Sequence, residues 1–161
     1  MYTKAFIGLA FFLSFWSCVS EIKLSKPSNP AILVTQIHLA IVADDTRQLN
    51  NLMVDKKELI NTLTEENDEI VYAYDADLFT MATDDETYKA YKNKLLKSYQ
   101  SIKKHPINWE KTNIQKATYQ TDSLQISIKG MLLIRDDKNS IDSIHFKGVK
   151  LLDIWALTEI Y

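Results

Sequence analysis

The last third of the chain alternates between apolar and polar positions, which is the pattern of β-strands with one buried face. From residue 124 to residue 135 every second residue is apolar or glycine: Leu124, Ile126, Ile128, Gly130, Leu132 and Ile134. This period of two predicts one long strand. Similar runs predict further strands at 113–120, 141–152 and 154–161, with polar turns at 121–123 and 136–139. Sequential strands joined by short turns predict an antiparallel sheet of about four strands.

The third of these strands also predicts which face of the sheet each side chain occupies. Ile144 and Phe146 are expected on the buried face, so His145 is expected on the opposite face. Gly148 is expected to mark a β-bulge.

From residue 30 to residue 63 the apolar positions instead recur every three or four residues, as on one face of a helix. Asn29 and Pro30 suit a helix start, because Asn caps free N–H groups and Pro fits the first turn. Asp45 begins a second helix, and Asp55 with Glu58 has the spacing of a capping box at a third. Three short helices are therefore expected here.

A longer helix is expected to begin at Thr83-Asp-Asp-Glu86, which also has capping-box spacing, and to end before His105-Pro106. Its apolar stripe is Tyr88, Tyr91, Leu95, Tyr99 and Ile102. Residues 64–68 are expected to form a loop, and residues 70–78 a short strand or an irregular segment. Helices first and strands last predict an α+β fold, with N-terminal helices packed on a curved C-terminal antiparallel sheet.

The first 17 residues form a leader. Lys4 and the amino terminus are positive, and residues 5–16 are a 12-residue apolar run. A helix of that length is too short for a hydrocarbon core, which needs about 20 residues. The leader therefore fits a signal peptide.

The single cysteine of the chain, Cys18, follows this run and the small residue Ser17 directly. The segment from Leu13 to Cys18 resembles a bacterial lipobox, in which the cysteine thiol receives diacylglycerol before cleavage. The resemblance implies cleavage before Cys18 and a palmitate-type lipid anchor there. It implies a place in the cell envelope, on the periplasmic or surface face of a bacterial membrane. The alternatives are an ordinary secretory signal cut nearby and an uncleaved anchor.

The chain is therefore expected to divide into a signal peptide at 1–17, the lipidated cysteine and a polar tether at 18–29, and a single α+β domain at 30–161. Removing the leader leaves 18 basic and 21 acidic residues, a net charge of about −3. That balance does not predict the clustered basic surface that nucleic acids require, so no nucleic-acid partner is expected. One cysteine excludes a disulfide framework, and three glycines make a glycine-rich phosphate loop unexpected.

Three short segments of this chain, and their positions relative to the expected helices and strands, are similar to those of a known superfamily. They are Ala43-Asp44-Asp45 before the second helix, Pro106 to Trp109 after the long helix, and Asp153 to Leu157 in the closing strand. With the order of elements, they resemble the NTF2-like (cystatin-like cone) superfamily, in its branch of small bacterial lipoproteins of unassigned function. The resemblance implies a sheet that wraps a long helix around a conical pocket. Some members place acids, tyrosines or histidines in that pocket and many do no chemistry, so fold alone does not give function.

The histidines are His38, His105 and His145, and their spacing matches no metal motif, so no metal or cofactor is expected. His38 is expected at the edge of the core, and His105 near the terminal carbonyls of the long helix. His145 is the best acid–base candidate if its face of the sheet lines a pocket.

Asp75 and Asp77 are the other weak catalytic candidates. They are expected on one side of an extended segment, beside Tyr72 and Tyr74, where two carboxylates could bind a cation or transfer a proton. The alternative is a solvated loop. Tyr72, Tyr74, Trp109 and Trp155 are expected to line a pocket or to belong to the core. The pairs Asp44-Asp45, Asp84-Asp85 and Asp136-Asp137 are better explained as caps and turns.

No complete catalytic set is present in the sequence, which favours a non-enzymatic envelope lipoprotein that binds a small ligand or an envelope protein. The alternative is an NTF2-like enzyme that performs proton transfer or hydrolysis with His145 and Asp75 or Asp77. A third hypothesis is a structural or inhibitory interaction module that uses an exposed sheet edge or the lipid-proximal surface. Convergence of His145 and a carboxylate in one apolar pocket would favour the enzyme.

Overall fold

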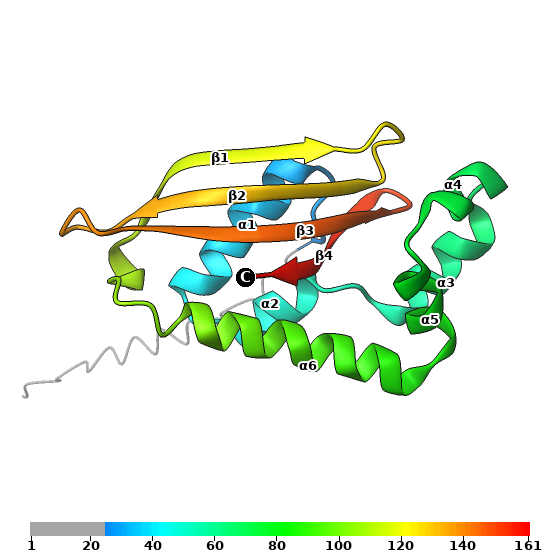
Figure 1. Ribbon diagram of the computed structural model, residues 1–161, viewed down its shortest axis with the longest axis horizontal. Helices are drawn as coiled ribbons and strands as arrows, with labels where there is room; N and C mark the ends of the chain where they lie inside the picture. The colour runs from blue at the N-terminus through cyan, green and yellow to red at the C-terminus, as the bar shows by residue number, and fades with distance from the viewer. Residues whose placement is uncertain (1–24) are drawn as a thin grey trace, which may run out of the picture.

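The computed structural model describes residues 25–161, so the leader and Cys18 lie outside the described residues. Within this range six α-helices precede a four-stranded antiparallel sheet that is not closed (Figure 1). The prediction of an α+β fold with helices before the sheet is confirmed. None of the helices in residues 25–161 combines the length and apolar character needed to span a bilayer.

The helices are α1 (Pro30–Val42), α2 (Thr46–Leu52), α3 (Lys56–Glu65), α4 (Asp68–Ala73), α5 (Ala76–Thr83) and α6 (Asp85–Ile102), and a 3-10 turn, η1 (Trp109–Lys111), follows them. Each α-helix begins after an Asn or Asp whose side chain accepts a hydrogen bond from a backbone N–H of the first turn. The six caps are Asn29, Asp45, Asp55, Asn67, Asp75 and Asp84. These caps let the chain restart helices without glycine.

Two expectations about this half of the chain are wrong. The expected strand or irregular segment at 70–78 is instead the end of α4 and the start of α5, because Asn67 and Asp75 cap two separate helices. Tyr74 lies between them in an extended conformation and is buried. The cap of α6 is Asp84 rather than Thr83, which ends α5.

The strands are β1 (Asn113–Thr121), β2 (Ser127–Arg135), β3 (Ile141–Leu151) and β4 (Ile154–Ile160), paired in that order. The register of β3 with β4 shifts between Lys147 and Gly148, so the predicted bulge is confirmed. The strand expected from residue 124 begins only at Ser127. The carboxylate of Asp122 holds the preceding turn by accepting from the N–H groups of Ile126 and Ser127, and Gln125 adopts a φ of 57°.

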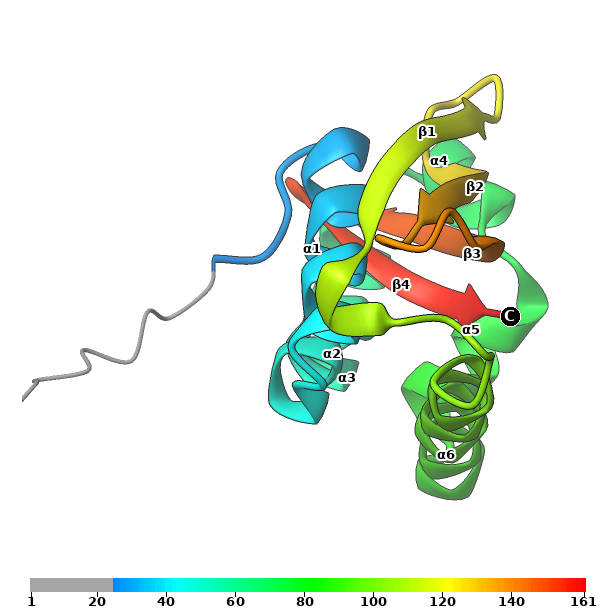
Figure 2. The same cartoon turned by 90° about the vertical axis from the view of Figure 1, so that its left-hand side faces the viewer.

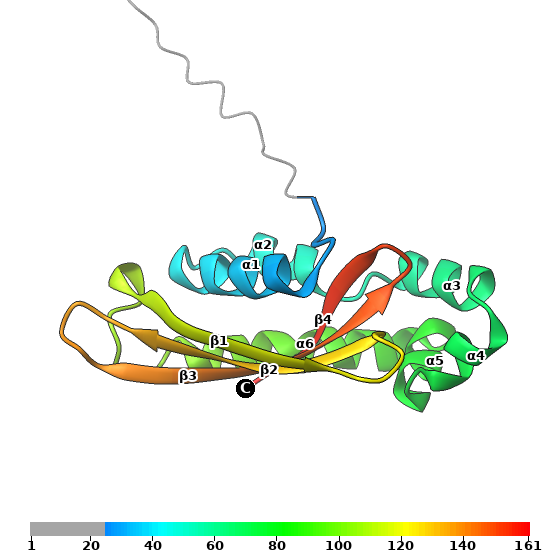
Figure 3. The ribbon, with the colours of Figure 1, turned by 90° about the horizontal axis from the view of Figure 1, so that it is seen from above.

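Helix α1 covers one face of the sheet, and most of the opposite face is open (Figures 2 and 3). The covered face is apolar and fully buried at Leu132, Ile134, Ile144 and Phe146. Gly130 is required here, because a Cβ would lie 2.5 Å from Cζ of Phe146 and 2.5 Å from the backbone oxygen of Thr118. His145 points to the opposite, exposed face, as its neighbours predict.

The outer edge of β4 is covered by other parts of the chain. The N–H of Trp155 donates to the carbonyl of Pro27 at 2.7 Å, and Met53 forms a parallel bridge with Leu157. Lys26 pairs with Glu58, so residues expected at the end of the tether already pack against the domain. The chain thus enters on the α1 side of the sheet (Figure 3). Strand β1, by contrast, is an exposed edge over almost its whole length.

Candidate functional site

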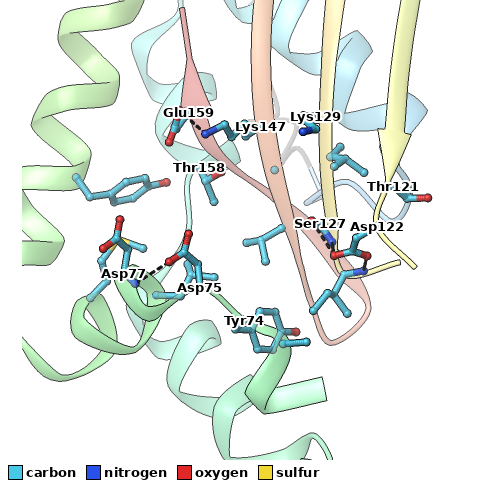
Figure 4. A pocket seen from close by; sticks show the side chains of 18 of the residues that line it. Tyr74, Asp75, Asp77, Thr121, Asp122, Ser127, Lys129, Lys147, Thr158 and Glu159 are labelled. Carbon is cyan, nitrogen blue, oxygen red and sulfur yellow. Dashed lines mark hydrogen bonds and ion pairs between the residues drawn. The ribbon is translucent and has the colours of Figure 1, made fainter. Parts of the chain in front are cut away.

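A pocket of about 910 Å³ lies where α5 and α6 approach the open face of the sheet (Figure 4). Its apolar lining includes Leu78 and Met81 from α5, Ile126 before β2, and Val149 from β3. These residues belong to a second apolar cluster, between the sheet and helices α3 to α5. The pocket has the size and the apolar lining typical of small-molecule sites, which hold about 300–1,000 Å³.

One wall of the pocket is acidic. Asp75 caps α5, and its Oδ1 accepts a hydrogen bond from the N–H of Asp77 at 3.3 Å. Both residues are exposed and line the pocket, and in residues 25–161 neither has an ion-pair partner. They lie at a helix start rather than on the extended segment expected from the sequence, because the cap at Asp75 winds the chain immediately.

A third carboxylate, that of Asp122, lies at the far side of the pocket and is already satisfied. It accepts hydrogen bonds from the N–H of Ile126 and from both the N–H and the hydroxyl of Ser127. Its role is to hold the turn between β1 and β2.

The sheet wall is basic. Lys129 of β2 lies directly opposite Lys147 of β3 in the ladder. Lys147 pairs with Glu159 of β4 at 3.1 Å, and the hydrogen bond and charge of Glu159 raise the pKa of Lys147, with a smaller contribution from Asp75. Lys129 has no acidic partner within the described range, and the same holds for Lys94, which lines the pocket from α6.

Two tyrosines fix the pocket walls. The Tyr74 hydroxyl donates to the carbonyl of Lys150 at 2.8 Å, and burial raises the pKa of Tyr74 to about 12. The Tyr91 hydroxyl donates to the carbonyl of Leu157 at 2.5 Å and accepts from the N–H of Val54 at 2.9 Å. Burial also raises the pKa of Tyr91. Both hydroxyls are therefore occupied in tying helices to the sheet.

Of the four aromatic residues considered for a pocket lining, only Tyr74 lies in this wall. Tyr72 points to solvent with 83% of its surface exposed, and Trp109 and Trp155 are buried in the core beneath α1. Trp155 enters this core with Leu157, whereas Ala156 between them joins the other apolar cluster, so the alternation of β4 decides the burial of Trp155.

His145 does not line the pocket that holds Asp75 and Asp77. It lies in a neighbouring shallow depression of the open face, where its ring stacks on that of Tyr161 with centroids 5.6 Å apart. The enzyme hypothesis requires His145 and a carboxylate in one pocket, and His145 lies outside the pocket that holds Asp75 and Asp77.

The other two histidines have structural partners. Nε2 of His38 lies 3.1 Å from Oγ1 of Thr112, which itself donates to the carbonyl of Trp109. His38 must therefore donate through Nε2–H, and burial lowers its pKa. The backbone N–H of His105 donates to the carbonyl of Ile102 at the end of α6 at 3.0 Å, as expected, but its ring instead contacts Asp142 at 2.5 Å. Within residues 25–161 no group of three His, Cys, Asp or Glu side chains could hold a metal ion.

The sequence did not single out Lys94, Lys129, Lys147 or Glu159. Lys129 and Lys147 stand at polar positions of alternating strands, which predicts their exposure. Their juxtaposition depends on the register of β2 with β3, which the short turn at residues 136–140 sets by pairing Arg135 with Ile141.

No protein-family model matches the chain, and a comparison with curated proteins also finds no match. The fold and the pocket together define an α+β domain with a charged and apolar pocket on one sheet face.

Proposed function

We propose that this protein is an exported envelope lipoprotein, anchored through lipid on Cys18, whose domain binds a small ligand without transforming it. The observation that carries the binding function is the pocket of about 910 Å³, with its apolar lining and unpaired charges on two walls. Pockets of this size and character are the usual sites of small ligands.

Binding rather than catalysis is supported by the state of the groups around the pocket. The hydroxyls of Tyr74 and Tyr91 are held by backbone partners, and Asp122 is satisfied within its own turn. His145 lies in the neighbouring depression. The remaining charged groups suit recognition of a ligand more than proton transfer, which needs an acid and a base at one reacting atom.

The point of entry of the chain agrees with an anchored binding domain. Residues 25–27 lie on the α1 side of the sheet (Figures 2 and 3). The pocket is lined by Lys129 and Lys147, which are exposed on the other face (Figure 4). A domain tethered at this point would keep its pocket accessible. The resemblance to the NTF2-like superfamily, in which helices and a curved sheet enclose a pocket, supports the same proposal.

Lipid anchoring is tested by expressing the full chain in a bacterial host supplied with an alkyne analogue of palmitate. The wild-type protein should become labelled and sediment with membranes, and the Cys18→Ser variant should be unlabelled. Label on Cys18→Ser, or a mature amino terminus elsewhere than Cys18, would contradict the anchor.

Ligand binding is tested by native mass spectrometry of the full chain after extraction from its membrane in mild detergent. The wild-type protein should retain an added mass. Ala90→Trp, which places a large side chain in the α6 wall of the pocket, should lose it. Ser101→Trp is the matched control, because Ser101 is an exposed α6 residue outside the pocket lining. An added mass that Ala90→Trp retains would place the ligand elsewhere.

A further inference from the structure

The charges that line the pocket differ in whether the protein itself pairs them. Four carboxylates and three lysines line it: Asp75, Asp77, Asp122, Glu159, Lys94, Lys129 and Lys147. Asp122 is held by its turn, and Glu159 and Lys147 pair with each other. Among the described residues no ion pair involves the carboxylates at the start of α5 or the ammonium groups of Lys94 and Lys129, although Asp75 is near enough to Lys147 to help raise its pKa.

We infer that the ligand of this pocket is a zwitterion, a short peptide with free ends. Its ammonium group is bound by Asp75 and Asp77 and its carboxylate by Lys129. This inference rests on the proposed binding function and names the class of ligand.

Lys129 carries most of the argument. It faces Lys147 directly across the ladder, and like charges in that position destabilise a sheet. Glu159 neutralises only Lys147. Lys129 thus has no ion pair that would offset this repulsion among the described residues, and an anionic group of a ligand would compensate it.

The acidic wall has a partial structural role, since Asp75 caps α5 and carboxylates in a first turn favour a helix start. One carboxylate is enough for that cap, and Asp77 adds a second that also lines the pocket. Figure 4 shows both acids on the helix side of the pocket, and Lys129 and Lys147 on the sheet side.

Opposite charges on opposite walls select a dipolar ligand. A simple anion would be repelled by Asp75 and Asp77 on the helix side, and a simple cation by Lys129 on the sheet side. The lining between the walls combines the apolar floor with polar side chains of Gln120 and Thr158, which can bond to peptide groups. An aliphatic peptide matches this order of charge, apolar span and charge.

The test uses the detergent-extracted full chain and the tripeptide alanyl-leucyl-alanine in four forms: free, N-acetylated, C-amidated and blocked at both ends. Isothermal titration calorimetry at low salt should find the free peptide bound tightest. Each block should weaken binding by about tenfold or more, as expected for loss of a charge-assisted hydrogen bond.

Variants assign each end of the peptide to its wall. Asp75→Asn with Asp77→Asn should abolish the preference for a free amino end and keep the preference for a free carboxylate, because Asn still caps the helix. Lys129→Gln should do the reverse, and Lys129→Arg should keep both. Asp68→Asn and Lys116→Gln, which change exposed residues outside the pocket, are the controls and should bind like the wild type.

The outcomes separate this inference from the proposed function. Two results would overturn the zwitterion inference: equal affinity for the free and doubly blocked peptides, or no binding of any form at millimolar concentration. The proposed binding function would still stand if native mass spectrometry finds a ligand that Ala90→Trp loses. Peptide binding that survives in Ala90→Trp would also overturn the zwitterion inference alone, because the peptide would then lie outside the pocket. A native added mass that Ala90→Trp retains would overturn the proposed function, and the zwitterion inference with it.

Discussion

The two faces of the sheet are built from alternate residues of the same strands, yet they differ in what they contribute. On the face beneath α1, Ile144 and Phe146 are fully buried, and Gly130 leaves room for the Phe146 ring. On the open face, His145 and Lys147 are exposed, and Lys129 stands unpaired opposite Lys147. A packed face can stabilise the fold, which leaves the other face free to hold charges that the fold does not need.

The largest effect is expected on the covered face. Phe146→Ala should lower the free energy of unfolding by about 3–5 kcal/mol, because Gly130 beneath it has no side chain to fill the cavity. Urea denaturation measures this loss. His145→Ala, one residue away on the open face, should change stability by no more than about 0.5 kcal/mol. Similar losses for the two variants would show that the faces do not differ in this way.

An intermediate effect is expected from His38, which belongs to the helix that covers this face. Burial lowers its pKa from the ordinary value of 6.5, so below that pH the unfolded chain binds the extra proton more readily than the folded one. Stability should therefore fall as the pH drops through 6.5 toward the folded-state pKa, and this contribution should be constant above 6.5.

Replacement by a residue that does not titrate separates His38 from the rest of the chain. His38→Gln keeps an N–H donor for Thr112, and it should flatten the decline in the urea midpoint between about pH 7 and pH 5, the range around the ordinary histidine pKa. The exposed His145→Gln is the control and should keep the wild-type decline. An unchanged profile in His38→Gln would exclude His38 as its source.

The smallest effect is expected on the open face. Lys129→Gln should raise the free energy of unfolding by about 0.2–1 kcal/mol at low salt, since it removes a like charge opposite Lys147. The gain should shrink at high salt, where charges on exposed side chains are screened. Lys116→Gln is matched, because Lys116 faces Leu133 rather than a lysine. A loss of stability in Lys129→Gln would mean that this lysine supports the fold after all.

The parts of the fold that the sequence predicts correctly are those set by signals between neighbouring residues. Caps at Asn29, Asp45 and Asp55 and the alternation through β2 act over a few residues, and the elements they predict are present. Residues 70–78 are an exception, because the closely spaced caps Asn67 and Asp75 leave helices too short for a visible apolar period. Tyr74 between them is buried through its contact with β3, which no local pattern carries.

The candidate site is predicted only in part, for a related reason. The sequence singles out Asp75 and Asp77, which do line the pocket, but His145 and the two tryptophans lie elsewhere. Which residues share a wall depends on how α5 and α6 dock against the sheet, and that docking joins residues far apart in the chain.

The sequence by itself determined the starts of α1, α2 and α3, the alternation of the strands and the separation of His145 from the core, because caps and side-chain period are properties of neighbouring residues. Only the tertiary structure decided that Lys129 and Lys147 lie across a pocket from Asp75 and Asp77. The docking of α5 and α6 against the sheet sets those distances, and that docking results from packing of the whole domain.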